Sequence, residues 1–200
     1  PQLDVEQLMG PIRYTGPIDN EKTYIKQIKR LGAGEYLVVN ANGLKRYTYW
    51  NRHLLREIRI DVSLDEAKKH IETLLRESVE YALQTDKPLA IMLSGGIDSS
   101  LVAKLAKDTG REVHTITAGY KGAYACDERD VARRFAAEQG FIHHEIELDE
   151  ADFQHCFEEF TQCMDEPITD SAAMAQWALF KKVKALGFDV LLGGMGGDEL

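Results

Sequence analysis

The fold is decided by the stretch Leu89-Ala-Ile-Met-Leu-Ser-Gly-Gly-Ile-Asp-Ser-Ser100. Its first five residues form a continuous apolar run, which is typical of a strand covered on both faces in a parallel sheet. The adjacent Gly95 and Gly96 predict a tight turn, and the residues from Ser100 to Lys107 follow a helical pattern. The stretch therefore predicts a β-strand, a glycine turn and an α-helix in immediate succession.

The same alternation of strands and helices extends along the chain. Apolar residues between Leu64 and about Thr85 recur at spacings of three and four, which predicts an amphipathic helix, and Ser63 with Glu66 forms a capping-box pattern at its start. Further strands are predicted at residues 113–117, 141–148 and 188–192, and further helices at 127–139 and 171–186. Alternating units of this length indicate an α/β fold with a parallel sheet and helices on both faces.

The first fifty residues differ from the rest because they are β-rich in pattern. Two strands are predicted at residues 35–40 and 44–50, joined by a turn at Ala41-Asn42-Gly43. An isolated two-stranded ribbon is only marginally stable in water. We therefore expect this piece to depend on a partner surface, with residues 51–62 as a connector.

The composition excludes several classes of protein. The 200 residues carry a formal net charge of −9 with a pI near 5.2, which disfavours binding to nucleic acid through clustered Lys and Arg. Cys126, Cys156 and Cys163 lack the spacing of a disulfide framework or a zinc site, so we expect buried, unreactive thiols. Neither a signal peptide nor a run of about 18 apolar residues is present, which predicts a cytoplasmic protein without membrane contact.

The glycine turn has the features of a phosphate cradle. Residues without side chains let backbone N–H groups approach an anion, and the following helix directs the positive end of its dipole to the same place. Ser94, Ser99 and Ser100 add hydroxyl donors. The G-x-x-x-x-G-K-[ST] spacing of common ATPases and GTPases is absent, so transfer of a γ-phosphoryl group is not implied.

Asp98 is the unusual member of this turn, because a carboxylate repels phosphate unless a cation lies between them. Mg²⁺ is a suitable cation, since it prefers oxygen ligands and is often held by one or two carboxylates together with phosphate oxygens. The simpler alternative is a tight strand-to-helix turn in which Asp98 caps the helix. The order of strand, S-G-G-x-D-S and helix favours the phosphate site.

The S-G-G-I-D-S-S motif resembles the pyrophosphate loop of the ATP pyrophosphatases (PP-loop proteins), which cleave ATP between its α and β phosphates. Within this group, Asp165-Glu-Pro-Ile-Thr-Asp-Ser171 and Leu192-Gly-Gly-Met-Gly-Gly-Asp-Glu-Leu200 resemble segments of the glutamine-hydrolysing asparagine synthetases. Three shorter stretches are also similar to that family: Leu31-Gly-Ala-Gly-Glu-Tyr-Leu37, Tyr49-Trp50-Asn51 and His143-His144-Glu145. The resemblance covers essentially the whole chain in the same order.

This resemblance implies a Rossmann-like adenine nucleotide α-hydrolase fold and a division of the chain. Residues 1–51 would be the β-rich tail of a glutaminase-like domain with its linker. Residues 52–200 would be a synthetase domain, incomplete at its carboxyl end, with the family's catalytic lysine beyond Leu200. The family's glutaminase uses an amino-terminal cysteine, whereas this sequence begins Pro1-Gln2, so ammonia would come from solution, from a preceding segment or from another subunit.

The resemblance also implies roles for individual residues. Glu166 and Asp198 would be catalytic, with Glu166 holding or deprotonating the attacking ammonia, and Asp127 would lie near the substrate. Asp98 and Asp170 would hold Mg²⁺ with the pyrophosphate. The expected ATP-binding residues are Leu93, Ser94, Gly95, Gly96, Asp98, Ser99, Ser100, Ala118 and Gly194, with Leu93 and Ala118 beside the adenine ring.

The leading hypothesis from this resemblance is an asparagine synthetase-like ligase, for which a homodimer is an expected assembly. Mg-ATP would adenylate the side-chain carboxylate of aspartate, and free or glutamine-derived ammonia would form the amide. One alternative is the same chemistry on another carboxylate, favoured by Met195 at a position that is usually acidic in the family. Another is an inactive relative that binds ATP without cleaving it. A tRNA-modifying enzyme is disfavoured by the acidic composition.

Simpler explanations compete for three of these segments. Residues 165–170 also fit a solvated acidic turn before a helix. Residues 193–197 also fit a flexible turn, although their glycine density favours close approach of the backbone to a ligand or another strand. His143 and His144 point to opposite faces of a strand, so they cannot share one metal ion and are expected to be structural or to lie near the substrate.

Overall fold

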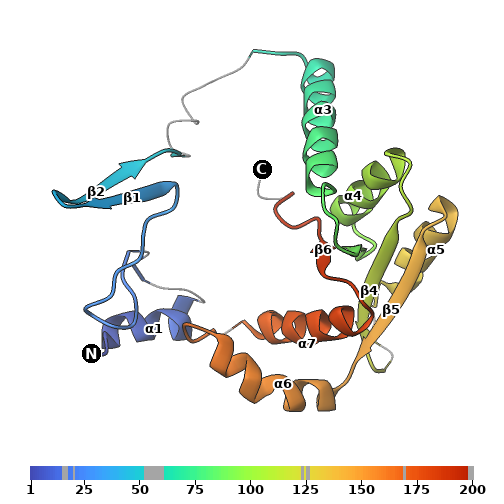
Figure 1. Ribbon diagram of the computed structural model, residues 1–200. Helices are drawn as coiled ribbons and strands as arrows, with labels where there is room; N and C mark the ends of the chain where they lie inside the picture. Colours follow the sequence, from blue (N-terminus) through green and yellow to red (C-terminus); the bar gives the residue numbers. More distant parts are fainter. Residues whose placement is uncertain are drawn as a thin grey trace. The chain divides into compact units, whose positions relative to one another are not determined.

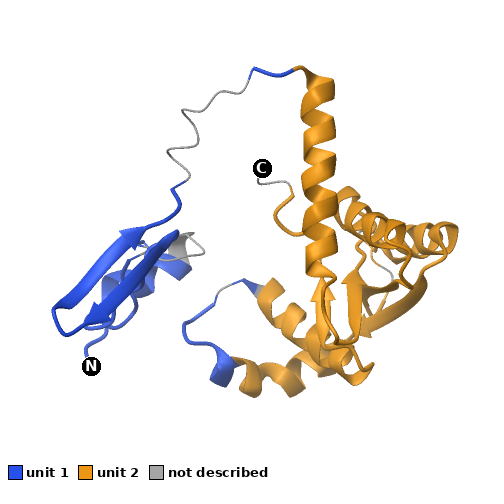
Figure 2. Cartoon of the chain, turned by 45° about the horizontal axis from the view of Figure 1, so that its top comes forward, with its two compact units in different colours: residues 1–62, 161–171 blue, residues 63–160, 172–200 orange. Residues whose placement is uncertain are grey.

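The computed structural model describes residues 1–14, 18–19, 21–51, 61–122, 124, 127–168 and 170–197, without the side chains of residues 12–14 and 171. They form two compact units (Figures 1 and 2): unit 1 is Pro1–Val62 with Thr161–Ser171, and unit 2 is Ser63–Phe160 with Ala172–Leu200. The sequence did not predict that residues 161–171 belong with the amino-terminal residues. The expected division at residue 51, into a glutaminase-like tail and a synthetase domain, stays a prediction.

Unit 2 is built on a parallel sheet, as predicted. Its strands follow the order β5-β4-β3-β6, and each neighbouring pair is parallel. The chain runs outward from β3 to β5 and then returns to the other side of β3, so the strand order reverses between β3 and β6. Ligands of open α/β sheets bind at the carboxyl ends of the strands beside such a reversal. The strands are β3 (Leu89–Met92), β4 (His114–Tyr120), β5 (Ile142–Leu148) and β6 (Val190–Leu192).

Helices cover both faces of this sheet (Figure 1). On one face lie α3 (Leu64–Ala82), α4 (Ile97–Asp108) and α5 (Arg129–Gln139), and on the other α6 (Glu150–Cys163) and α7 (Ser171–Ala185). Neighbouring residues of β3 alternate between the two cores, since Ile91 packs with the first group of helices and Ala90 with the second. Burial on both faces explains why this strand is apolar at every position.

The sequence analysis missed α6, whose apolar residues are separated by acidic and polar ones. The helix buries Cys156 and Phe160, which are four residues apart and therefore share one face. The expectation of a buried thiol is confirmed for Cys156. It was wrong for Cys163, which is exposed at the last position of the helix. Cys126 lies outside the described residues.

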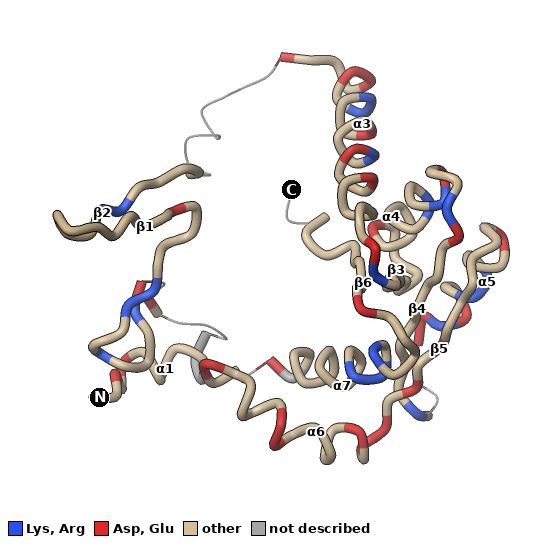
Figure 3. Tube along the Cα trace, viewed as in Figure 1, with Lys and Arg blue, Asp and Glu red and all other residues tan. Residues whose placement is uncertain are grey.

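The start of α3 confirms the predicted capping box. The Ser63 hydroxyl accepts a hydrogen bond from the Glu66 amide at 3.3 Å, and the Glu66 carboxylate accepts one from the Ser63 amide at 2.9 Å. Val79 is buried near the carboxyl end, whereas Ile71 and Leu74 are exposed. Figure 3 shows acidic and basic residues interspersed along the same helix. Within unit 2, the predicted apolar stripe therefore packs on the sheet over its second half only.

Unit 1 contains the predicted hairpin and a helix that was not predicted. β1 (Glu35–Asn40) and β2 (Gly43–Thr48) pair antiparallel, and Gly43 takes the positive φ of 113° that glycine adopts readily. The rings of Tyr36 and Tyr47 stack across the hairpin with centroids 5.1 Å apart. α1 (Val5–Tyr14) occupies a segment that we expected to be β-rich.

No helix within the described part of the chain combines the length and the apolar composition needed to cross a membrane.

Candidate active site

The loop after β3 is held in shape by two of its own serines. The Gly96 amide donates to Ser94 Oγ at 3.2 Å, and Ser99 Oγ donates to the Gly96 carbonyl at 3.2 Å. The hydroxyl oxygens of Ser94 and Ser99 lie 3.0 Å apart, and the Ser94 amide donates to Ser99 Oγ at 3.1 Å. Both hydroxyls were expected to serve phosphate. In the structure they close the turn, and Ser99 is only 6% exposed.

Two further backbone features of this loop bear on anion binding. Gly95 has a positive φ of 86°, a conformation that residues with a Cβ rarely adopt. Gly96 is the N-cap of α4, and no side chain caps the first amides of this helix. The interpretation of Asp98 as the cap was therefore wrong: Asp98 lies in the first turn with its side chain exposed. The helix dipole and the first-turn amides, which no side chain caps, together favour a negative group at this point.

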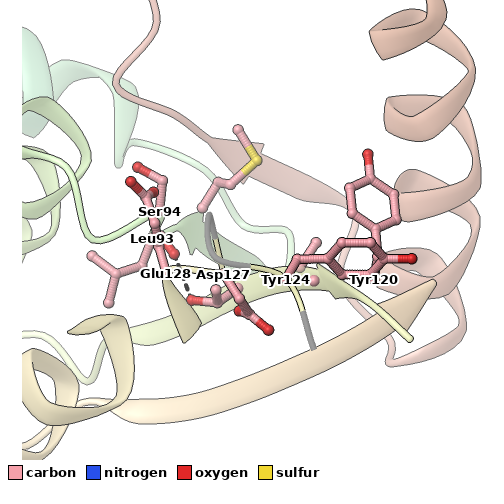
Figure 4. Close-up of a pocket in the computed structure, with 10 residues that line it drawn as sticks. Leu93, Ser94, Tyr120, Tyr124, Asp127 and Glu128 are labelled. Atoms are coloured by element: carbon pink, nitrogen blue, oxygen red, sulfur yellow. Dashed lines mark hydrogen bonds between the residues drawn. The ribbon is translucent and has the colours of Figure 1, made fainter. Parts of the chain in front are cut away.

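A pocket of about 180 Å³ opens beside the loop, at the carboxyl ends of β3 and β4 (Figure 4). Four predicted site residues from three segments of the chain line it together: Leu93, Ser94, Ala118 and Asp127. The other lining residues are Met92, Thr117, Gly119, Tyr120, Tyr124 and Glu128. Pockets that bury a drug-sized ligand measure roughly 300–1,000 Å³, so this one suits a ring better than a whole nucleotide.

Asp127 is fixed by an arginine that the sequence analysis missed. Arg129 Nε lies 3.0 and 2.9 Å from the two carboxylate oxygens of Asp127, and Nη2 lies 2.5 Å from one of them. These hydrogen bonds from Arg129 hold the pKa of Asp127 below its ordinary value. The same pairing raises the pKa of Arg129. Asp127 is therefore an ionised carboxylate in the pocket wall at neutral pH.

The loop after β6 lies against the first turn of α4. A Cβ at Gly194 would come within 2.6 Å of the Ser99 amide nitrogen, and a Cβ at Gly197 within 2.8 Å of the Asp98 carboxyl carbon. Gly194 and Gly197 thus serve a close backbone approach to helix α4, whereas the sequence suggested approach to a ligand or another strand. Met195, between these glycines, is 78% exposed. The structure brings Gly194 next to the first turn of α4, which carries Asp98.

The remaining predicted site residues include two that belong to unit 1 and one outside the described residues. Glu166 and Asp170 fall in residues 161–171, which belong to unit 1, and there Glu166 forms an ion pair with Arg30. Ser100 is partly buried in α4. Asp198 lies outside the described residues. The meeting of Glu166, Asp170 and Asp198 with Asp98 therefore stays a prediction.

The two histidines of β5 occupy opposite faces, as expected. His143 Nδ1 lies 2.9 Å from the Thr115 hydroxyl, whereas His144 Nε2 lies 3.1 Å from His114 Nδ1 and its ring packs on Phe188. Burial lowers the pKa of both histidines. Their contacts are structural and do not bring them to one metal ion.

A metal held by protein ligands alone does not fit this site. Among the described residues, no group of three or more His, Cys, Asp or Glu side chains is placed to hold a metal ion. A single exposed carboxylate, Asp98, instead fits a Mg²⁺ ion that arrives with phosphate oxygens, because this ion commonly takes one or two carboxylates from the protein.

Comparison with known families gives one match over more than half of the chain. The family model described as asparagine synthase matches residues 70–200. Amidase chyE of Penicillium rubens is 30% identical over 194 residues, which cover 89% of this chain and 29% of that protein. The glutamine-hydrolyzing asparagine synthetase 2 of Oryza sativa subsp. japonica is 33% identical over 143 residues, which cover 64% of this chain and 24% of that protein.

Among solved structures, the NH3-dependent NAD synthetase from Campylobacter jejuni is similar over 65% of this chain and 56% of its own, with a TM-score of 0.39 and 20% sequence identity. The curated relatives are considerably longer than the region they share with this chain, which spans only 24% and 29% of the two described above.

Proposed function

The chain belongs to the asparagine synthase family, and we propose that it supplies the nucleotide site of an ATP-dependent amide-forming ligase. The observation that carries this proposal is the pocket at the carboxyl ends of β3 and β4, which adjoins a glycine loop and a helix N-terminus without a side-chain cap. A ring-sized pocket beside an anion site matches the two ends of a purine nucleotide.

In this proposal, the adenine ring of ATP lies between Leu93 and Ala118. The phosphates lie over Gly95 and Gly96, where the amides of the loop and of the first turn of α4 bind them. The Asp98 carboxylate holds the Mg²⁺ ion that accompanies the nucleotide and offsets the charge of its phosphates. Ser94, Ser99 and Ser100 support the loop and its helix, and Gly194 lets the β6 loop lie close to it.

The proposed chemistry is an adenylation followed by amide formation. A substrate carboxylate attacks the α-phosphate and expels pyrophosphate, which turns a poor leaving oxygen into a good one. Ammonia then attacks the acyl carbon, AMP leaves, and a proton of the nitrogen passes to Glu166. Asp198 is the second proposed catalytic carboxylate, Asp170 the second for Mg²⁺, and Asp127 a contact to the substrate.

Aspartate is the first candidate for the activated carboxylate, because the family and several relatives carry asparagine synthetase names. A different carboxylate is the second candidate. It is suggested by the match to a protein named amidase, which is 30% identical over 89% of this chain, whereas two relatives named asparagine synthetases are 26% and 28% identical over 92% and 88% of it. Met195 also favours it, since an exposed thioether replaces the usual acid beside the loop.

Nucleotide product analysis on the natural protein tests the proposal. The protein is given Mg-ATP, aspartate and ammonium, and the products are separated by ion-exchange chromatography. Asp98→Asn should lower AMP formation by roughly 100-fold or more, because the loop loses its metal-binding charge. Asp108→Asn is the matched control: Asp108 lies at the other end of α4, where it pairs with Lys104 and Arg76.

The outcomes separate the candidates. AMP, pyrophosphate and asparagine that disappear in Asp98→Asn but persist in Asp108→Asn support the leading proposal. AMP released only with another carboxylate supports the second candidate. ADP as the product contradicts the assignment of the loop, and ATP binding without cleavage identifies an inactive relative.

A further inference from the structure

We propose that Arg129 is a positioning residue for the nucleotide pocket: its guanidinium holds Asp127 in the pocket wall and ties that wall to the end of β4. The inference rests on the proposed function, because it takes this pocket as the ATP site. It concerns a residue outside all the motifs that resemble asparagine synthetases.

One guanidinium group joins three segments of unit 2. Besides its bonds to Asp127, Arg129 donates from Nη2 to the Tyr120 carbonyl at 3.3 Å and from Nη1 to Glu147 at 3.2 Å. The Arg129 amide also donates to Asp127 at 3.0 Å. The Arg129 side chain is only 16% exposed. Asp127 and Tyr120 line the pocket (Figure 4), so two of the three segments that Arg129 contacts are parts of its wall.

Gly119 makes room for this arrangement. A Cβ at Gly119 would lie 2.4 Å from Arg129 Nε and 2.6 Å from its Cδ, so the arginine occupies the space that a side chain would need. No positive φ at this residue requires glycine. The packing of Arg129 on the β4 backbone is therefore the reason for glycine here, and Gly119 itself lines the pocket.

Arg133, one turn later on α5, forms its ion pairs away from the pocket wall. It pairs with Glu145 of β5 and with Asp130 of its own helix, at 2.5 and 2.6 Å. Neither partner lines the pocket, and the Arg133 side chain is 54% exposed. Both arginines attach α5 to the edge strand β5, but only Arg129 reaches the pocket. The helix thus provides its own matched control.

Loss of the Arg129 guanidinium should weaken ATP binding more than catalysis. Asp127 would lose the partner that fixes its rotamer, and the end of β4 would lose a hydrogen bond from Arg129. These changes affect the pocket equally before and in the transition state, so KM for ATP should rise while kcat changes little.

The test compares four variants of the natural protein by equilibrium binding of ATP and by steady-state kinetics. Arg129→Gln should raise the Kd and KM for ATP about tenfold, with kcat within about threefold. Arg133→Gln should leave both within about twofold. Arg129→Lys should recover part of the loss, because an ammonium can pair with Asp127 but cannot form the planar fork of bonds.

Gly119→Ala keeps the arginine but fills its space, so it should weaken ATP binding in the same direction as Arg129→Gln. This variant keeps the proposal testable if Arg129→Gln folds poorly, which thermal melting would detect.

Equal losses in Arg129→Gln and Arg133→Gln would overturn the positioning role. Wild-type protein that binds ATP but releases no AMP would contradict the proposed ligase chemistry. The positioning role of Arg129 would then be decided by the Kd values for ATP alone. Wild-type protein that does not bind ATP would overturn both.

Discussion

The loops after β3 and β6 meet at the same edge of the sheet, but their shapes have different origins. The first contains Ser94 and Ser99, whose hydroxyls bond to each other and to the loop backbone. The second, residues 193–197, consists of four glycines and a methionine and has no polar side chain with which to fix itself. It fits because a Cβ is absent where Gly194 meets α4. Local sequence therefore specifies the shape of one loop of the candidate site, while packing specifies the shape of the other.

Adding a single methyl group to the second loop should give the largest effect. In Gly194→Ala the new Cβ would meet backbone atoms of Asp98 and Ser99 at 2.6–2.7 Å, so one loop must move. We expect a loss of stability of about 1–3 kcal/mol, as for other overpacked sites, and a strong loss of AMP formation. Urea unfolding followed by the fluorescence of Trp177 in unit 2, with Trp50→Phe as background, measures the stability.

Gly193→Ala is the control for this change. Its Cβ would have no neighbour closer than 3.7 Å, which is ordinary van der Waals contact. Stability and AMP formation should stay near those of the parent. Equal losses in the two alanine variants would show that the loop needs flexible glycines rather than close approach.

Removal of one hydroxyl from the first loop should have the next largest effect. Ser99→Ala removes the hydroxyl partner of the Ser94 amide and of the Gly96 carbonyl, two part-buried hydrogen bonds whose loss we expect to cost about 1–3 kcal/mol. Ser100→Ala, one residue later on α4, is the comparison. If both variants have the same urea midpoint of unfolding as the parent protein, the hydrogen bonds of Ser94 and Ser99 do not fix the loop.

A change at the positive-φ glycine should be smaller again. Gly95→Ala forces an L-residue to φ near 86° and should cost about 1–2 kcal/mol. Gly96→Ala should cost less, because Gly96 has a φ of −75° and an extended conformation. The same urea measurement ranks the stabilities of the two variants. A larger loss in Gly96→Ala than in Gly95→Ala would contradict the positive φ of Gly95.

Acidification should have the smallest effect and should act on neither loop. Burial lowers the pKa of His143 and His144 below the ordinary value of 6.5, so the unfolded chain binds more protons than the folded one just below pH 6.5. Stability is fully present above the unfolded pKa and declines as pH falls from there toward the lowered folded pKa. His144→Gln should reduce this decline between pH 7 and 5. The difference in stability between Gly194→Ala and Gly193→Ala should stay constant over this range. If it changes with pH, the β5 histidines and the β6 loop are coupled.

Much of the fold of unit 2 could be predicted because its elements carry local signatures. The capping box at Ser63, the continuous apolar run of β3 and the glycine turn each follow from residues close in sequence. α6 was missed because Phe160 and Cys156 stand among acidic residues, and their common face is defined only by tertiary contacts: Cys156 joins the core, and Phe160 packs on Trp177. α1 was missed because the strand patterns at residues 35–50 indicated that the whole amino-terminal segment was β-rich.

The candidate site was predicted in part. Leu93, Ser94, Ala118 and Asp127 do line one pocket, because loops after parallel strands meet at one edge of a sheet. Arg129 escaped prediction. Its role depends on Gly119, ten residues away in sequence, and on Glu147 of a neighbouring strand.

By itself, the sequence determined that this chain forms a parallel α/β sheet with a glycine turn between β3 and α4, because hydrophobic period, helix caps and glycine dihedrals act over a few residues. Only the tertiary structure decided which residues share the pocket, which hydroxyls are used within the loop, and why Gly119 and Gly194 carry no side chain. These properties depend on atoms brought within 3 Å by strand order and helix packing, and no local pattern records which distant atoms those will be.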